Sequence, residues 1–381
     1  MIAFIQNMSL NSHNQGGSAK IFQSLLDIDH PALLSVNTNP ASSPVTRTIS
    51  EIQLPLRPYF GRLEHTRLHG FIGLLDGLFG PRFEQRLRRV LRDFKIRLIH
   101  LHANAYTLLP VIRVAADLHI PYFLSIHDDL EYLSRNHLLR KAMLAGMARA
   151  WRSAKGVFAG SDEIGQEYSR RYGAREYRFV TDGLRDVAGA PRQSPEKSLR
   201  LYFMGLFHNT YAQNLRAALD ALKIVRSQRP DWDICVTCRC GRLSIPIHHD
   251  DVPVTVLPFA AQAEVEKDML TAGLLYQPMP FQEYARAFNR FSLSIKMINY
   301  LGSGSMIFYH GPEDAAACKL LRSYKAAAIC ATLNPEEIAK QLLDAVASRT
   351  SIAENALALA RSQFMLVDHQ RRFWQPILAA L

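Results

Sequence analysis

The stretch IRLIHLHANAYTLLPVIRVAADLHIPYFLSIH, residues 96–127, decides the fold class. Its first and last segments, IRLIHLH and IPYFLSIH, are apolar runs of strand length, and TLLPVIRVAADLH between them has the apolar spacing of a helix with a proline near its N-terminus. A strand, a helix and a second strand in succession predict a right-handed crossover between parallel strands. The stretch therefore indicates an α/β fold with helices packed on a parallel sheet.

The same alternation extends in both directions from this stretch. Before it, MIAFIQ and PALLSVN are predicted strands, but residues 38–81 are rich in Pro, Ser and Gly and are predicted to be irregular. After it, strands and amphipathic helices alternate to the C-terminus, interrupted by a polar segment with Pro and Gly at residues 187–197. We interpret this segment as a linker between two domains.

The sequence thus predicts two Rossmann-like, doubly wound domains, residues 1–188 and 198–364, which we expect to face each other across a cleft. The last helix, about residues 365–381, is expected to pack back on the first domain. A chain of 381 residues is long enough for two such cores. No run of 18 apolar residues occurs, and the start of the chain turns polar too early for a signal peptide, so we expect a cytoplasmic protein.

The net charge of +11 is concentrated in two stretches, and indicates an anionic partner. Residues 82–97 hold seven basic and two acidic side chains, and residues 135–155 hold six basic and no acidic ones. Both stretches have an apolar helical face, which favours packing on the protein's own sheet. Peripheral contact with an anionic membrane surface is the alternative. Nucleic acid is not expected, because no known binding module is present.

The five cysteines, at positions 235, 238, 240, 318 and 330, are predicted to be free thiols. The segment CVTCRC, residues 235–240, has the first half of a zinc-ligand pattern, but no second Cys or His pair follows at zinc spacing. The segment is also apolar enough to be a buried strand, and we favour that interpretation. No metal site is predicted.

The segment SLSIKMINYLGSG, residues 292–304, is the strongest candidate for a phosphate site. Ser292 and Ser294 are suitable N-cap residues, and a helix N-terminus binds anions through its free N–H groups and its dipole. Lys296 falls in the first turn, where the dipole disfavours a cation unless an anion compensates it. An exposed, solvated lysine is the alternative.

Two further loops follow predicted strands and carry polar residues. The loop NSHNQGGSAK contains Gly16 and Gly17, which allow close approach of the backbone to a ligand, although a plain strand-to-helix turn explains them equally well. In SIHDDLEYL, His127 is placed to donate a hydrogen bond to a ligand hydroxyl, and one of the two following aspartates, Asp128 or Asp129, is expected to cap a helix. His100 and His102 alternate along one strand and are expected to be structural or supporting.

Taken in order, several segments resemble the retaining glycosyltransferases of GT-B fold, in the large group called family 4, and its Ser-x-Lys subgroup in particular. These segments are QGGSAK, LIHLHANAYTLLPVIRVAADLHIPYFLSIHD, FAGSDEIGQEYSRRYG, LRLYFMGLFHNTYAQNLRAALDAL and SLSIKMINYLGSGSMIFYHGP, and they span nearly the whole chain. The resemblance implies transfer of a sugar from a nucleotide-sugar donor, held by the second domain, to an acceptor held by the first. It implies no bound metal or other cofactor, because cationic side chains and helix N-termini stabilise the leaving diphosphate.

The resemblance also implies a set of site residues. His127 would be the catalytic residue beside the transferred sugar, and His102 and Asp128 would support it or contact the acceptor. The donor would be bound by Gly16, Gly17, Gly205, Ser294, Lys296 and Asn299.

The chain departs from the family pattern at three places. Leu206 and Ala212 stand where many members carry an arginine and a lysine, and Asn299 stands where a ribose-binding carboxylate is usual. Phe291 occupies the position of the other family carboxylate, which the Ser-x-Lys subgroup relaxes. Replacement cations near predicted strand ends would be Arg239, Arg242 and Arg290.

The sequence supports an active glycosyltransferase that builds a cell-surface polysaccharide or glycolipid on a glycan or lipid-linked acceptor. A catalytically silent GT-B relative that acts as a binding or scaffold subunit is the alternative, because of the departures above. A nucleotide-sugar epimerase of the same fold is a third possibility, although it should carry more acidic and basic residues in its cleft.

Overall fold

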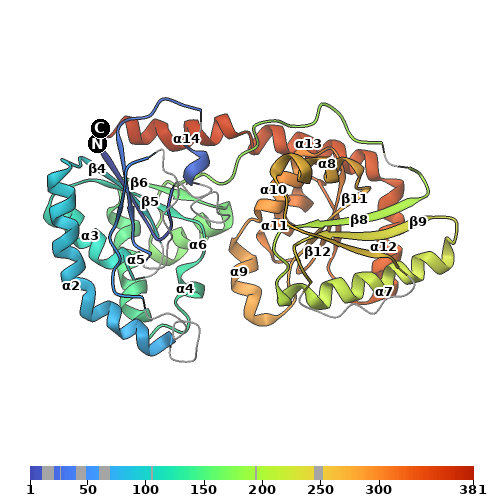
Figure 1. The fold of residues 1–381 in the computed structure, drawn as a ribbon, viewed down its shortest axis with the longest axis horizontal. Helices are drawn as coiled ribbons and strands as arrows, with labels where there is room; N and C mark the ends of the chain where they lie inside the picture. The colour runs from blue at the N-terminus through green and yellow to red at the C-terminus, as the bar shows by residue number, and fades with distance from the viewer. Residues whose placement is uncertain are drawn as a thin grey trace. The chain divides into compact units, whose positions relative to one another are not determined.

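The computed structural model describes residues 1–10, 21–25, 27–39, 49–59, 69–103, 106–193, 195–243 and 252–381. These residues form two compact units. Unit 1 comprises Met1–Asp182 together with Leu366–Leu381, and unit 2 comprises Gly183–Met365. Each unit is an α/β structure built on its own parallel sheet (Figure 1).

Unit 1 contains a seven-stranded sheet in the order β3-β2-β1-β4-β5-β6-β7, and its neighbouring strands are all parallel. Every residue of β1, β2, β4 and β5 is buried, as expected for strands covered on both faces. The strand order reverses between β1 and β4, which is where ligands bind such sheets. The strands are β1 (Ile2–Gln6), β2 (Leu33–Asn37), β3 (Glu51–Gln53), β4 (Leu98–His102), β5 (Tyr122–Ile126), β6 (Gly156–Ala159) and β7 (Arg178–Phe179).

Helices cover the unit 1 sheet, and α2, α3 and α5 contact one another in succession. The helices are α2 (His69–Asp93), α3 (Leu108–Asp117), α4 (Leu130–Leu133), α5 (Arg140–Ser153), α6 (Asp162–Tyr172) and α14 (Leu366–Leu378).

The prediction of irregular structure at residues 38–81 is wrong at its C-terminal end, because α2 begins at His69 and continues through the proline at position 81. Within α2, the glycine at position 73 permits close packing. A Cβ on Gly73 would lie 2.7 Å from the ring of His137, so only glycine fits there without a shift of that ring. A short strand, β3, also lies within the range predicted to be irregular.

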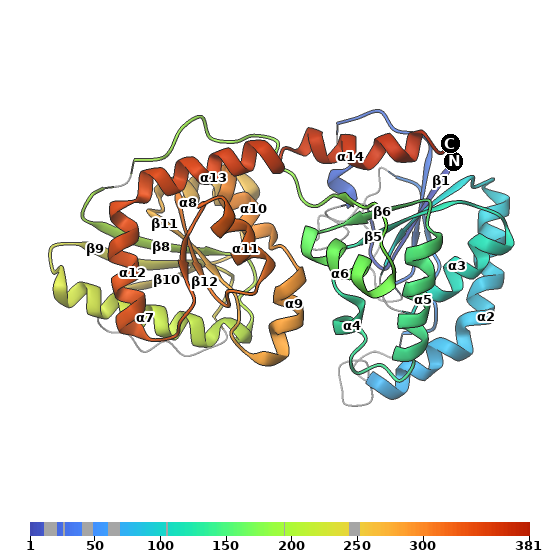
Figure 2. The ribbon, with the colours of Figure 1, turned by 180° about the vertical axis from the view of Figure 1, so that it is seen from behind.

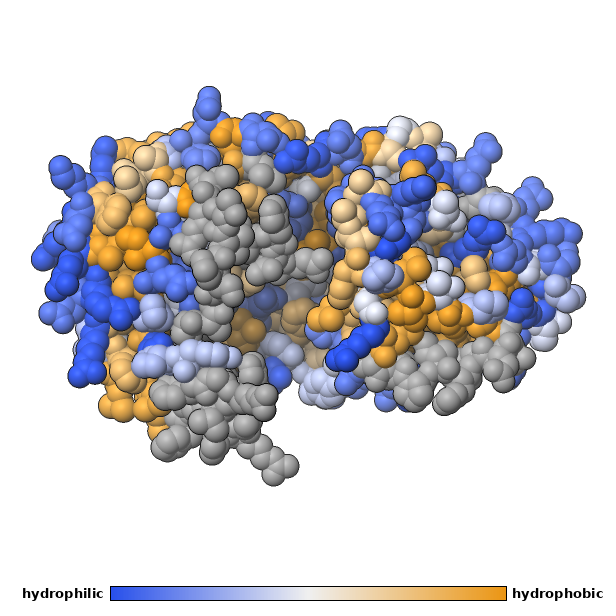
Figure 3. All heavy atoms as spheres, in the orientation of Figure 1, coloured by the Kyte–Doolittle hydropathy of each residue, from blue (hydrophilic) through white to orange (hydrophobic). Residues whose placement is uncertain are grey.

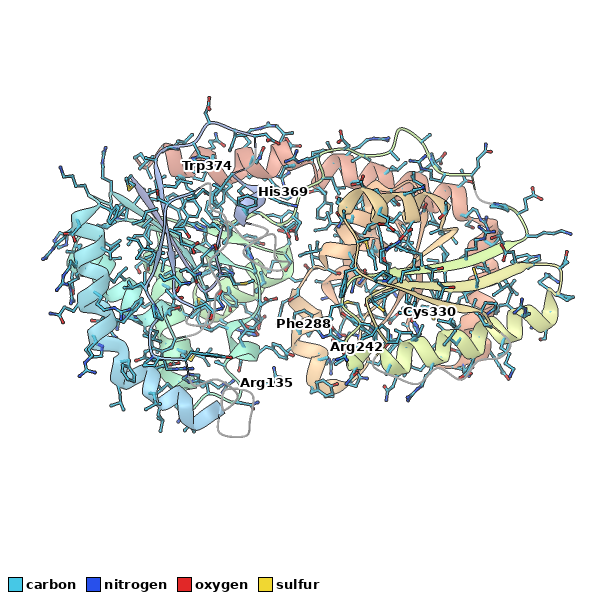
Figure 4. The ribbon with its side chains drawn as sticks, in the orientation of Figure 1. Arg135, Arg242, Phe288, Cys330, His369 and Trp374 are labelled. Carbon is cyan, nitrogen blue, oxygen red and sulfur yellow. The ribbon has the colours of Figure 1, made fainter. Side chains whose placement is uncertain are left out.

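The C-terminal helix α14 belongs to unit 1, where its aromatic side chains enter the core. The Phe373 ring lies against Phe4, His100 and Phe158, with ring centres 6.1, 5.1 and 4.9 Å apart. The indole N–H of Trp374 donates to the Ser24 carbonyl at 2.7 Å. Figure 4 shows Trp374 on this helix.

Unit 2 contains a six-stranded parallel sheet in the order β10-β9-β8-β11-β12-β13, which reverses between β8 and β11. Helices α7 and α12 pack together on one face, and α10 and α13 on the other (Figure 2). Its strands are β8 (Ser198–Met204), β9 (Asp233–Arg239), β10 (Val254–Leu257), β11 (Leu274–Pro278), β12 (Met306–His310) and β13 (Ala328–Cys330). Its α-helices are α7 (Ala212–Gln228), α8 (Gln262–Thr271), α9 (Arg286–Phe291), α10 (Ile295–Gly302), α11 (Ala316–Ser323), α12 (Pro335–Ala347) and α13 (Arg349–Gln363).

The two parallel sheets with flanking helices confirm the predicted doubly wound α/β fold. The apolar runs that predicted strands became buried parallel strands, and the amphipathic segments became the covering helices. The prediction that CVTCRC forms part of a buried strand is also confirmed, because Cys235 and Cys238 lie in β9 and Cys238 and Cys240 are buried.

Candidate functional site

Gly205 follows β8 directly, at the point where the strand order of unit 2 reverses. Its φ of +87° is in the left-handed region, which favours glycine over residues with a side chain. Its N–H donates to the carbonyl of Arg239 at 3.0 Å, and this bond ties the loop after β8 to the end of β9. This bond holds the loop after β8 at the edge of the sheet where ligands bind.

The side chain of Lys296 lies over this glycine. A Cβ on Gly205 would be 3.5 Å from Lys296 Cδ, which is ordinary contact. The ammonium group lies 4.5 Å from the centre of the Phe203 ring and 5.0 Å from the centre of the Tyr211 ring. Both distances suit cation–π attraction, so two aromatic faces hold the ammonium beside the glycine.

The positive charge of Lys296 is not balanced by an acidic side chain among the described residues. Burial lowers the pKa of its ammonium to about 8, although the residue as a whole keeps part of its surface exposed. Among the described residues, Lys296 takes part in no ion pair. Burial and the nearby Lys296 charge also lower the pKa of His208. A bound anion would supply the missing compensation.

The N-terminus of α10 adds hydrogen-bond donors at the same place. Ser294 is the N-cap residue, in an extended conformation, and its hydroxyl makes no capping bond. Lys296 is the second residue of the helix, as predicted, and Asn299 lies three residues on, partly exposed on the same side. The first N–H groups of a helix have no partner within it, so these amides and the Ser294 hydroxyl can bind an anion beside the Lys296 ammonium.

The arginines proposed as replacement cations differ in their surroundings. Arg239 is buried and paired with Asp268 and Glu264 on α8, and also donates to the Pro258 carbonyl at 3.1 Å. Its guanidinium is thus occupied within the protein, which does not favour a role in binding the donor. Arg242 and Arg290 are exposed, and Arg290 lies 5.3 Å from the centre of the Phe291 ring. Figure 4 shows Arg242 on the loop after β9.

At the carboxyl edge of the unit 1 sheet, two histidines from neighbouring strands meet. His102 ends β4, His127 follows β5, and their ring centres are 4.7 Å apart. Both side chains are largely buried. Gly160 approaches closely, because a Cβ there would lie 3.1 Å from the His127 Cα. The structure therefore brings the two predicted histidines together.

Two of the polar residues near this pair, His100 and Asp129, have structural contacts. His100 is fully buried, its Nε2 lies 2.7 Å from the Ser125 hydroxyl, and burial lowers its pKa to about 3. Asp129 is the helix cap, because it accepts from the Glu131 N–H and from Arg171. Asp128 is half-buried beside His127. The expectations of a structural His100 and of an aspartate cap are confirmed.

Sequence reasoning missed the aromatic residues that hold Lys296. Phe203 and Tyr211 lie on either side of Gly205 in YFMGLFHNTY, and the density of aromatic residues around the glycine was the available signal. Gly160 was missed as well, although it follows β6 directly. The predicted Gly16 and Gly17 lie outside the described residues.

The basic stretches form α2 and α5, whose apolar faces are buried and whose charges are partly paired. Phe83 and Leu87 on α2, and Met147 on α5, are buried against unit 1. On the outer side, Leu78 is 73% exposed and Leu138, in the loop before α5, is 60% exposed. Figure 3 shows hydrophobic surface over this part of unit 1 next to hydrophilic side chains. Within the described ranges, no helix combines the length and apolar character needed to span a membrane.

Comparison with known proteins agrees with this geometry. Residues 43–181 match the glycosyl transferase 4-like domain. No protein with a curated description matches the chain.

Solved structures of similar fold align over nearly their whole length. The chain is similar to an α,α-trehalose-phosphate synthase (UDP-forming) from Burkholderia vietnamiensis, with 13% identity, a TM-score of 0.65 and coverage of 99% of this chain and 97% of that one. It is similar to sucrose-phosphate synthase from Thermosynechococcus elongatus, with 12% identity, a TM-score of 0.64 and coverage of 100% and 99%. It is also similar to MurG from Acinetobacter baumannii, with 14% identity, a TM-score of 0.56 and coverage of 99% of both chains. The chain therefore has the GT-B fold, and its residues 43–181 match the glycosyl transferase 4-like domain.

Proposed function

We propose that this protein transfers a sugar, with retention of configuration, from a nucleotide-diphosphate sugar to a glycan or lipid-linked acceptor. The observation that carries the proposal is the Lys296 ammonium, buried beside Gly205 and the N-terminus of α10 and without an ion-pair partner among the described residues. Similar structures support the donor class, because one is described as UDP-forming and another as bound to UDP-2-fluoro glucose.

The proposed chemistry concerns charge on the leaving group. Transfer breaks the bond between the sugar's anomeric carbon and a diphosphate oxygen, and forms a bond from that carbon to the oxygen of an acceptor hydroxyl. The proton of that hydroxyl passes to the departing diphosphate or to water. The diphosphate gains negative charge as the bond breaks. Lys296, the Ser294 hydroxyl and the first amides of α10 would stabilise that charge without a bound metal, and preorganised donors of this kind are often the largest contribution to catalysis.

Unit 1 would hold the acceptor. His127 would donate a hydrogen bond to a hydroxyl of the transferred sugar, and His102, whose ring centre lies 4.7 Å from that of His127, would orient it. Asp128 would contact the acceptor. Asn299 would bind the ribose through its amide, and Arg290 remains a candidate for the donor phosphates.

We also propose that unit 1 contacts the inner face of a membrane, where a lipid-linked acceptor would be found. The exposed Leu78 and Leu138 beside basic residues of α2 have the composition of an interfacial surface. The protein should co-float with vesicles that contain anionic lipid at low salt. Leu78→Glu should reduce the fraction of protein that floats. Lack of flotation at low salt would exclude this surface as a docking site.

A catalytically silent binding subunit is the second candidate. It is favoured by Leu206, which is 53% exposed at the position directly after Gly205, where many family members have an arginine. The two candidates differ in turnover and not in fold.

Calorimetry with UDP, GDP and their sugar conjugates tests both candidates. The glycosyltransferase proposal predicts binding of at least one nucleotide, and hydrolysis or transfer of its sugar in the presence of an acceptor extract. Binding without any turnover would support the silent subunit. No binding of any nucleotide would exclude the enzyme.

A further inference from the structure

A cavity of about 650 Å³ lies in unit 1 at the opposite edge of the sheet from His127. It is formed at the starts of β5, β6 and β7, by the C-terminal end of α5, residues 172–178 and the last part of α14. Phe123 and Val157 form its apolar wall. Its volume is within the range of small-molecule sites in proteins, about 300–1,000 Å³.

The cavity is strongly cationic. Arg152, Lys155, Arg175 and Arg178 line it, and Glu176 is the only acidic side chain among its lining residues. Within the described part of the chain, none of the four cations is in an ion pair.

Some of this charge has a structural role. Arg175 donates to the Trp151 and Ala154 carbonyls, so it caps the C-terminal end of α5, where the helix dipole is negative. Arg178 donates to Gln375 at 3.3 Å, a neutral partner. Arg152 and Lys155 are exposed, and within the described residues their side chains form neither an ion pair nor a hydrogen bond. Since one dipole offsets only about half a charge, the cavity keeps a positive potential.

Two half-buried tyrosines, Tyr172 and Tyr177, supply flat walls beside these cations. Burial raises the pKa of both phenols, so the rings stay neutral near pH 7 and do not repel an anion. Between them, Gly173 has open space around it, because a Cβ there would meet no atom within 4 Å. The cavity thus combines cationic groups with aromatic rings, and the space beside Gly173 leaves room for a ligand to enter.

We propose that this cavity binds a phosphorylated organic molecule with a planar ring. Arg152, Lys155 and Arg178 would bind the phosphate, and the ring would lie against Tyr172 or Tyr177. His127 lies four positions after Phe123 of the cavity wall, about 13 Å along an extended strand. The site is therefore separate from the proposed donor and acceptor residues.

Hydrogen exchange of the whole protein, with adenosine monophosphate or inorganic phosphate as the probe, tests this proposal by location. Adenosine monophosphate should protect amides in residues 152–157 and 172–178, and any binding at the donor site would instead protect residues 292–304. Protection by inorganic phosphate should need at least tenfold higher concentration, because it lacks the ring. Equal potency of the two probes would exclude the role of the tyrosines.

Charge reversal on α5 provides a matched pair of variants. Arg152→Glu should raise the half-protecting concentration of adenosine monophosphate at least tenfold, whereas Lys141→Glu, exposed on the same helix but outside the cavity, should leave it unchanged. Lys155→Glu provides a second test if Arg152→Glu unfolds. Absence of protection at residues 152–157 and 172–178 at millimolar probe, or protection that both cavity variants retain, would overturn the proposal.

Discussion

The carboxyl edges of the two sheets carry different chemistry. At the unit 2 edge, the Lys296 ammonium lies between two aromatic rings and beside Gly205, next to a helix N-terminus. At the unit 1 edge, the imidazoles of His102 and His127 lie side by side and largely buried. The first arrangement suits an anion, and the second suits hydrogen bonds to sugar hydroxyls. In the proposed function, unit 2 binds the donor and stabilises the departing diphosphate, and unit 1 holds the acceptor and contacts the transferred sugar.

Replacement of His127 tests the unit 1 half of this comparison and has the largest expected effect. His127→Ala should lower turnover about 10³-fold, within the range that a positioned acid–base or hydrogen-bonding group contributes. Nucleotide affinity, measured by calorimetry, should stay unchanged, because the nucleotide is assigned to unit 2. A large loss of nucleotide affinity with normal turnover would contradict the division between the units.

Replacement of Arg239 tests whether this residue belongs to the donor site or to the core of unit 2. Arg239→Met should lower the free energy of unfolding by about 3 kcal/mol, since it leaves Asp268 partly buried without its partner. Arg200→Met is the control, because the Arg200–Asp233 pair is exposed and should contribute less than about 1 kcal/mol. If Arg239→Met instead weakened nucleotide binding without loss of stability, Arg239 would be a donor ligand.

The pH dependence of nucleotide affinity sharpens the account of Lys296. Because its pKa is lowered to about 8, the free protein loses this charge as the pH rises through 8. Affinity for a nucleoside diphosphate should therefore fall about tenfold between pH 7 and 9.5. Lys296→Arg should show little change over this range, because a guanidinium stays charged. An equal fall in both proteins would assign the effect to another group.

The fold of both units could be predicted from the sequence because burial on both faces makes parallel strands nearly continuous apolar runs. The start of α2 could not, because the same glycine that breaks a solvated helix permits close packing against His137. That contact joins positions 64 residues apart in the sequence. Composition alone does not distinguish a glycine that ends a helix from a glycine that lets a helix pack closely against another residue.

The geometry of the candidate site was predictable where a local rule applies. Lys296 in the first turn of a helix violates the dipole preference, and the structure places it there. Its aromatic partners, Phe203 and Tyr211, come from β8 and the segment before α7, and only tertiary packing brings them to Lys296. Arg239 is a similar case, because its acidic partners on α8, Glu264 and Asp268, are also distant in sequence.

The most direct test of the central claim is calorimetric titration of the preferred nucleoside diphosphate into Lys296→Ala. The matched control is Lys319→Ala, an exposed lysine on α11 in the same unit. We expect Lys296→Ala to weaken binding by about 2 kcal/mol, or about 30-fold, on the scale of a lost charged hydrogen bond, and Lys319→Ala to bind as the unchanged protein does. Equal affinity in all three proteins would show that the donor phosphates do not bind at Lys296.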